Sequence, residues 1–99
     1  MFSTPPPRMT AENAEALALS GFVRLAADDE LLMRFSNITG ILANDMRAAA
    51  TQPGFLVGVL DFYLSHEPDL IAWAEADNFP PEQALGARYA LAPDDPSGF

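Results

Sequence analysis

The sequence contains no cysteine and no lysine, and each absence excludes several kinds of protein. Without cysteine there is no disulfide framework and no thiolate metal site. Without lysine, five arginines stand against 14 acidic residues, and the formal net charge is −9. Binding to nucleic acid and to anionic membranes depends on positive charge. We therefore expect neither from this chain on its own.

A long hydrophobic run is also missing, and we do not expect residues 1–8 to act as a signal peptide. The longest apolar run, residues 55–60, is too short to cross a bilayer. Residues 1–8 include three consecutive prolines and lack the hydrophobic segment of a signal peptide. We predict a cytoplasmic protein with one helical domain over residues 10–92. A flexible proline-rich lead-in is expected over residues 1–9, and a flexible acidic tail over residues 93–99.

What the sequence does contain is helical periodicity, and residues 53–65 show it most densely. Apolar side chains cover most of the circumference of this predicted helix, so other helices should surround it. The remaining strip holds Gly54, Gly58, Asp61 and Ser65. This strip is either a place where another helix approaches closely or the one face that reaches water. We predict an all-α fold, a compact bundle of five or six short helices around this central helix.

A first helix is expected to begin after Thr10, as its N-cap, and to run to about Ala27. Its inward stripe recurs at helical spacing and consists of Ala14, Leu17, Ala18, Gly21, Phe22 and Leu25. Leu19 and Val23 lie outside that stripe, four residues apart on one face. They form either a second edge of the core or part of a surface for a partner.

A second helix is expected to begin at Asp28 or Asp29 and to end at Gly40 in the left-handed conformation. Its inward residues are predicted to be Leu31, Leu32, Phe35 and Ile38. Glu30 and Arg34 should form a local ion pair, because they are four residues apart on a helix.

Three more helices complete the predicted bundle. Asn44 is expected to cap a short one that ends near Thr51, and two others cover residues 68–77 and the segment after Pro80. Asn78 is a second candidate for the left-handed conformation. The pattern around Gly40 returns there at an offset of 38, either as a structural pseudo-repeat or by coincidence of cap chemistry. The predicted core comprises Leu17, Phe22, Leu32, Phe35, Phe55, Leu56, Val59, Leu60, Phe62, Leu70 and Trp73.

Chemistry-bearing residues are few. The helix pair around Gly40 has the outline of a DNA-binding helix-turn-helix, with Asn44, Asp45 and Arg47 near the start of its second helix. Asp45 would repel phosphate, so two packed helices are the simpler interpretation. His66 and Glu67 are adjacent, but no nucleophile or further metal ligand stands at a recognisable spacing. We predict no catalytic, cofactor or metal site and no cofactor.

Several segments together resemble a known family. The matching residues are an acid followed by Leu31-Leu32, then Arg34-Phe35, Thr39-Gly40, Met46-Arg47-Ala48-Ala49, Pro53-Gly54-Phe55-Leu56 and Val59-Leu60-Asp61-Phe62. This pattern is similar to a family of short alphaproteobacterial proteins described as a domain of unknown function. The resemblance covers about residues 10–92. It implies a small helical cytoplasmic bacterial protein and supplies no catalytic residues.

The functional prediction is a non-enzymatic protein interaction or adaptor module that binds a protein partner or forms a homodimer. Its candidate interaction surface is Leu19, Val23 and Arg47. The alternative is a helix-turn-helix-like protein associated with transcription, which would act with a basic partner. A small enzyme using His66 and Glu67 is a third hypothesis.

Overall fold

The computed structural model describes residues 9–92, and within them the chain is helical, as the sequence predicts. These residues form six α-helices and one short 3₁₀ turn, with no strand. The elements are α1 (Ala11–Ala26), α2 (Asp29–Thr39), the 3₁₀ turn η1 (Ala43–Asp45), α3 (Met46–Ala49), α4 (Pro53–Leu64), α5 (Glu67–Asp77) and α6 (Glu82–Leu91). The predicted lead-in over residues 1–9 (apart from Met9) and the predicted tail over residues 93–99 lie outside the described residues.

The helix boundaries follow local cap chemistry. The Oγ1 atom of Thr10 accepts a hydrogen bond from the Asn13 amide at 3.0 Å and so begins α1. Asp28 begins α2 in the same way, because its Oδ1 accepts from the amides of Glu30 and Leu31. Both predicted left-handed residues are confirmed, Gly40 with φ 78° and Asn78 with φ 62°.

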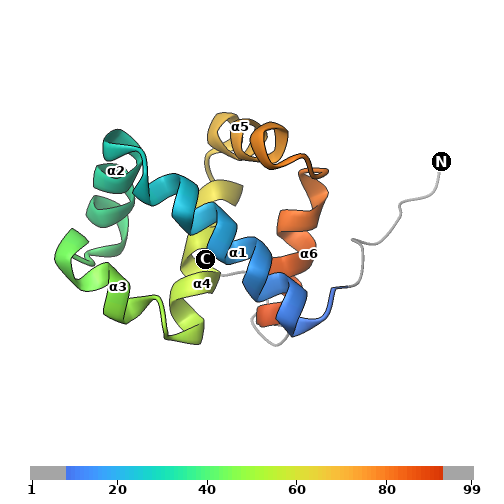
Figure 1. Cartoon of the computed structure of the whole chain (residues 1–99), viewed down its shortest axis with the longest axis horizontal. Coiled ribbons are helices and arrows are strands. Elements are labelled where there is room, and N and C mark those ends of the chain that lie inside the picture. The colour runs from blue at the N-terminus through green and yellow to red at the C-terminus, as the bar shows by residue number, and fades with distance from the viewer. Residues whose placement is uncertain (1–8, 93–99) are drawn as a thin grey trace.

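The centre of the bundle is made by α1, α4 and α6, which pack against one another (Figure 1). In this view α2 and α3 lie on one side of them, and α5 lies above on the other side. The left-handed turn at Gly40 thus lies between α2 and α3, beside the centre, whereas the turn at Asn78 joins α5 to α6, which is part of the centre. The central helix α4 buries side chains around most of its girth: Phe55, Leu56, Val59, Leu60, Phe62 and Tyr63.

Aromatic rings form a continuous chain through this core. Neighbouring ring centroids are 4.5 to 5.7 Å apart, and most pairs meet edge to face. The chain runs in the order Phe22, Phe55, Phe35, Phe62, Tyr63, Trp73 and Phe79. Such pairs contribute about 0.5–1.5 kcal/mol each beyond their burial. The chain links α1, α2, α4 and α5 into one unit.

The narrow strip of α4 does not receive a closely approaching helix. A Cβ atom added to Gly54 or Gly58 would meet no atom within 4 Å. Gly54 and Ser65 are exposed. Asp61, farther along the strip, accepts from the buried Arg88 of α6, with Nε to Oδ1 at 2.8 Å. The strip thus reaches water at both ends and carries an ion pair to α6 between them.

The predicted core is confirmed in its main members, with differences at the edges. Leu17, Phe22 and Leu32 are only partly buried, although they pack against the core. Ile38 was expected to face inward, but it is 58% exposed. Ile38 lies in the last turn of α2, and Ile41, beyond the Gly40 turn, makes the core contact instead.

Three local predictions are wrong. Asn44 does not cap a helix, because it lies inside η1, where the Asp45 amide donates to the Leu42 carbonyl at 2.8 Å. The α-helix that follows has four residues and ends at Ala49, short of the predicted Thr51. Arg34 forms no local pair with Glu30 and instead donates to Asp69 of α5, with Nη1 to Oδ2 at 3.0 Å.

Candidate functional site

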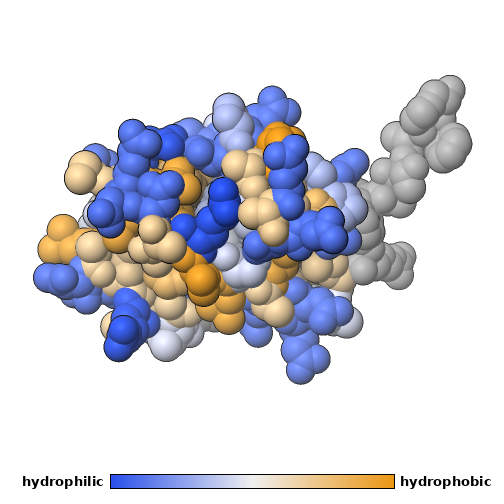
Figure 2. Space-filling view, turned by 45° about the horizontal axis from the view of Figure 1, so that its top comes forward, coloured by the Kyte–Doolittle hydropathy of each residue, from blue (hydrophilic) through white to orange (hydrophobic). Residues whose placement is uncertain are grey.

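One side of α1 faces away from the bundle although the helix lies at its centre. Ala14, Ala18, Gly21 and Leu25 are buried on the inner side. The opposite side carries Ala16, Leu19, Val23, Ala26 and Ala27, all exposed, and we call these five residues the outer face of α1. Figure 2 shows orange and pale-orange atoms across the middle of the molecule, with blue atoms around them and a group of deep blue atoms among them near the centre.

Leu19 and Val23 are therefore surface residues and not a second edge of the core. Leu19 is 43% exposed and Val23 is 65% exposed. The other members of the outer face are alanines and were not singled out in the sequence. The signal was present, since residues 16, 19, 23, 26 and 27 follow the spacing of one helical face.

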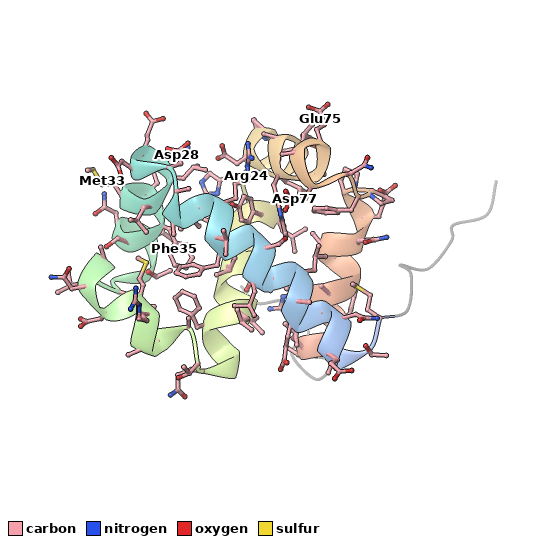
Figure 3. All side chains as sticks on the ribbon, in the orientation of Figure 1. Arg24, Asp28, Met33, Phe35, Glu75 and Asp77 are labelled. Carbon is pink, nitrogen blue, oxygen red and sulfur yellow. The ribbon has the colours of Figure 1, made fainter. Side chains whose placement is uncertain are left out.

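A cleft adjoins this face between α1 and the end of α5. It has a volume of about 570 Å³, and we call it the α1–α5 cleft. Its lining residues are Ser20, Val23, Arg24, Ala27, Asp28 and Asp77. In Figure 3, Arg24 and Asp77 lie between the two helices, and Asp28 lies at the junction of α1 and α2. Val23 and Ala27 belong to both the cleft and the outer face, so the two are continuous.

The side of the cleft nearest α5 is fixed by the buried indole of Trp73. Its Nε1–H donates to the Ser20 Oγ at 3.2 Å and to the Asp77 Oδ2 at 3.1 Å. Ser20 in turn donates to the Leu17 carbonyl at 2.9 Å. These bonds hold Asp77 and Ser20 in place without any bound molecule. Sequence reasoning missed both contacts, the one to Ser20 because it joins residues 53 positions apart, and the one to Asp77 although it joins residues only four positions apart on α5.

Below the cleft, Tyr63 joins α4 to α1. Its fully buried hydroxyl donates to the Gly21 carbonyl at 2.8 Å. Burial raises the pKa of the Tyr63 phenol, and the carboxylates of Asp69, Asp77 and Asp28 add to the rise, while Arg24 opposes it. The phenol thus stays protonated at neutral pH and serves as a fixed donor within the core.

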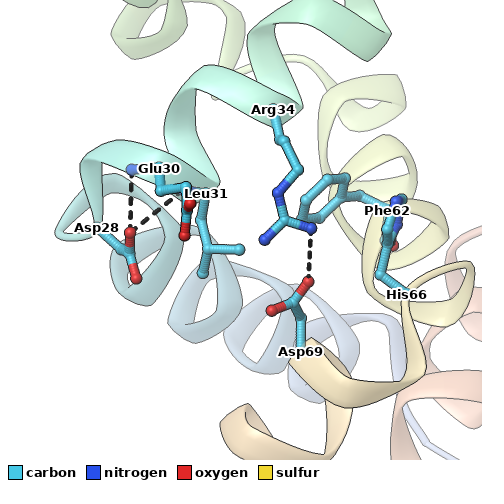
Figure 4. A network of polar contacts seen from close by, with 7 residues as sticks. All are labelled: Asp28, Glu30, Leu31, Arg34, Phe62, His66 and Asp69. Carbon is cyan, nitrogen blue, oxygen red and sulfur yellow. Dashed lines mark hydrogen bonds and ion pairs between the residues drawn. The ribbon is translucent and has the colours of Figure 1, made fainter.

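A second polar group closes the gap between α2 and α5 (Figure 4). Arg34 reaches Asp69 there, and the His66 ring lies 4.7 Å from the ring of Phe62. The His66 Nδ1 atom is 2.8 Å from the Phe62 carbonyl, to which it can only donate. Glu67 is exposed at the first position of α5. Neither His66 nor Glu67 lines the α1–α5 cleft. Their arrangement is typical of the junction between two helices and not of a reactive pair.

Arg47 is not brought together with Leu19 and Val23. It is exposed on α3, which lies below α2 in Figure 1, whereas the outer face of α1 crosses the middle of the molecule. The helix that would enter a DNA groove is α3, and it has only four residues. Asp45 immediately precedes it. The helix-turn-helix interpretation gains no support from this geometry.

Two kinds of feature are absent from the part of the chain that the structure describes. Within residues 9–92, no three histidine or carboxylate side chains are grouped so that they could hold a metal ion. No helix in the same range is long and apolar enough to cross a membrane.

Comparison with known proteins identifies a family. The family described as "Protein of unknown function (DUF3572)" has a model that matches residues 11–94, which is most of the chain. No curated protein and no solved structure matched the chain. The family match and the resemblance found in the sequence cover nearly the same residues.

Proposed function

The chain belongs to this DUF3572 family, and we propose that the protein is a non-enzymatic interaction module whose outer face of α1 binds a protein. The bound protein is either a different chain or a second copy. The observation that carries the proposal is the exposure of Leu19 and Val23 on the helix that forms the centre of the bundle.

Apolar exposure at this place needs an explanation. Single exposed apolar residues are ordinary on protein surfaces. Here, however, five uncharged residues follow one another along a helix in a chain with 19% charged residues. Burying one valine or leucine side chain contributes about 1.5–3 kcal/mol. A helix placed along this face would gain part of that contribution from Leu19, which is 43% exposed, and from Val23, which is 65% exposed, while the neighbouring alanines would allow close approach.

The proposal also includes a cytoplasmic location in an alphaproteobacterium, which the resemblance of the sequence supports. It assigns no catalytic role to His66 or Glu67. The transcription-associated alternative is not proposed, because α3 is a single turn and carries Asp45 beside Arg47.

The test compares three tagged proteins: wild type, Val23→Glu and Met33→Glu. Met33 is a matched control because it is 64% exposed, against 65% for Val23, and lies on the far side of α2 (Figure 3). Proteins that co-purify with wild type from the native cells are expected to remain with Met33→Glu. They should fall by about tenfold or more with Val23→Glu, as for a central interface residue.

If the bound protein is a second copy of the chain, the same variants test the proposal by another measurement. Light scattering after size exclusion, at several concentrations, would then show a dimer that Val23→Glu dissociates and Met33→Glu does not. The proposal is wrong if Val23→Glu keeps both the oligomeric state and every co-purifying protein of the wild type.

A further inference from the structure

The charges around the outer face of α1 restrict which partner it can accept. The face itself carries no charged residue from Ala16 to Ala27. At the helix rise of 1.5 Å per residue, this uncharged length is about 17 Å. A partner helix of about 12 residues would cover it.

Both ends of the outer face are acidic. Glu12 and Glu15 are exposed on the first turns of α1. Asp28, Asp29 and Glu30 follow the other end and are also exposed. A positive charge on a partner would therefore meet carboxylates at either end of the face, where the attraction is stronger at low salt.

Arg24 does not change the sign of this surface. It is half-buried in the α1–α5 cleft, whose lining also includes the carboxylates of Asp28 and Asp77. One positive and two negative side chains leave the cleft with a negative charge.

A second copy of the chain fits this pattern poorly. If two α1 helices paired antiparallel, Glu12 and Glu15 of one copy would face residues 28–30 of the other, acid against acid. Parallel pairing would set Glu12 and Glu15 against themselves. Either arrangement places like charges opposite each other, which lowers the affinity of the pair.

From these observations we infer that the outer face of α1 binds an amphipathic helix of a different protein, with arginine or lysine at both ends of its apolar stripe. This inference rests on the proposed function and adds the chemistry of the partner. The apolar stripe packs on Leu19 and Val23, and the basic ends pair with the acidic residues before Ala16 and after Ala27.

The test uses two synthetic helical peptides that share one leucine stripe. One carries arginines in its first and last turns, and the other carries glutamates at the same positions. Each is titrated by calorimetry into the full chain as wild type, Val23→Glu and Met33→Glu, at low and at moderate salt. Both variants add the same negative charge, so a general attraction to basic peptides would rise equally in both.

The arginine peptide is expected to bind the wild type and Met33→Glu within about twofold of each other. Its affinity for Val23→Glu should be about tenfold lower or more, and added salt should weaken all binding. The glutamate peptide should not bind.

Three results would overturn the inference, and each says something different about the proposed function. Equal binding of both peptides, lost in Val23→Glu, would leave the apolar surface standing and remove the requirement for charge. A wild-type dimer that Val23→Glu dissociates would assign the face to a second copy. Binding of neither peptide, or equal binding of the arginine peptide to both variants, would reject the basic helix, and the co-purification experiment would then decide the proposed function separately.

Discussion

At the scale of single residues, Tyr63 makes the stability depend on alkaline pH. The chain has no cysteine and no lysine, so its two tyrosines are the only side chains with ordinary pKa values between about 8 and 12. Burial raises the pKa of Tyr63 in the folded state, whereas an unfolded chain releases that proton near pH 10. The unfolded state then binds fewer protons than the folded state. The contribution of Tyr63 to stability is thus complete below about pH 10 and is lost as the pH rises further.

Urea unfolding at pH 7 and at pH 11 measures this effect. The free energy of unfolding of the wild type should fall between the two values. Tyr63→Phe should be less stable at pH 7 by about 1 kcal/mol, since the Gly21 carbonyl loses its partner, and its stability should depend less on alkaline pH.

Tyr89→Phe provides the matched control, because Tyr89 is 54% exposed and lies on α6, away from the buried bond between Tyr63 and Gly21. It should keep the alkaline loss of the wild type. If Tyr63→Phe and Tyr89→Phe have the same pH dependence, the assignment to the buried phenol is wrong.

Among the features of single residues, the helix caps could be predicted from the sequence. Gly40 and Asn78 are left-handed, and Thr10 and Asp28 cap helices, because each of these outcomes depends on a few neighbouring atoms. The bond from Tyr63 to Gly21 joins residues 42 positions apart, and no local pattern announces it.

At the scale of elements, the packing of Trp73 of α5 against α1 depends on Gly21. A Cβ atom at this position would lie 2.8 Å from the Trp73 ring. Trp73 has little room to move. Its Nε1–H donates to both Ser20 and Asp77. Its ring packs on the rings of Tyr63 and Phe79. Gly21→Ala should therefore lower the free energy of unfolding by about 1–3 kcal/mol.

Gly58→Ala is the opposite case within α4. Its Cβ would meet nothing within 4 Å, so the gain in helix propensity should stabilise the chain by about 0.5–1 kcal/mol. Thermal or urea unfolding of both variants gives the comparison. A change of the same sign in the two proteins would contradict the packing described for α1 and α5.

Element order was predictable, whereas the ends of elements and the pairs between them were less so. The apolar pattern of α4, with Pro53 at its first position and Pro68 shortly after its end, defines the helix without tertiary information. The segment after Gly40 forms the 3₁₀ turn η1 and the single turn of α3. The predicted longer helix does not form there, although Asn44 is a residue type that often caps helices. Glu30 was the local candidate for an ion pair with Arg34, but Arg34 pairs instead with Asp69, which is 35 residues away in the sequence.

At the scale of the whole molecule, the candidate site follows from what does not pack on α1. A helical wheel places Leu19 and Val23 on one face but cannot say whether another helix covers it. Whether the face is covered depends on which helices pack on α1 and on which side. The helices α2, α4 and α6 and Trp73 of α5 all contact its inner side or the edges of that side. The family match agrees with the extent of the helical fold and leaves the function to be tested.

The most direct test of the central claim places a photo-crosslinking amino acid at position 23 and, in a separate protein, at position 33. Both are exposed to the same degree, so a random collision would label them equally. On illumination in the native cells, position 23 should give a discrete adduct with another protein, and position 33 should not. No adduct at position 23, or the same adducts at both positions, would show that the outer face of α1 is not the interaction surface.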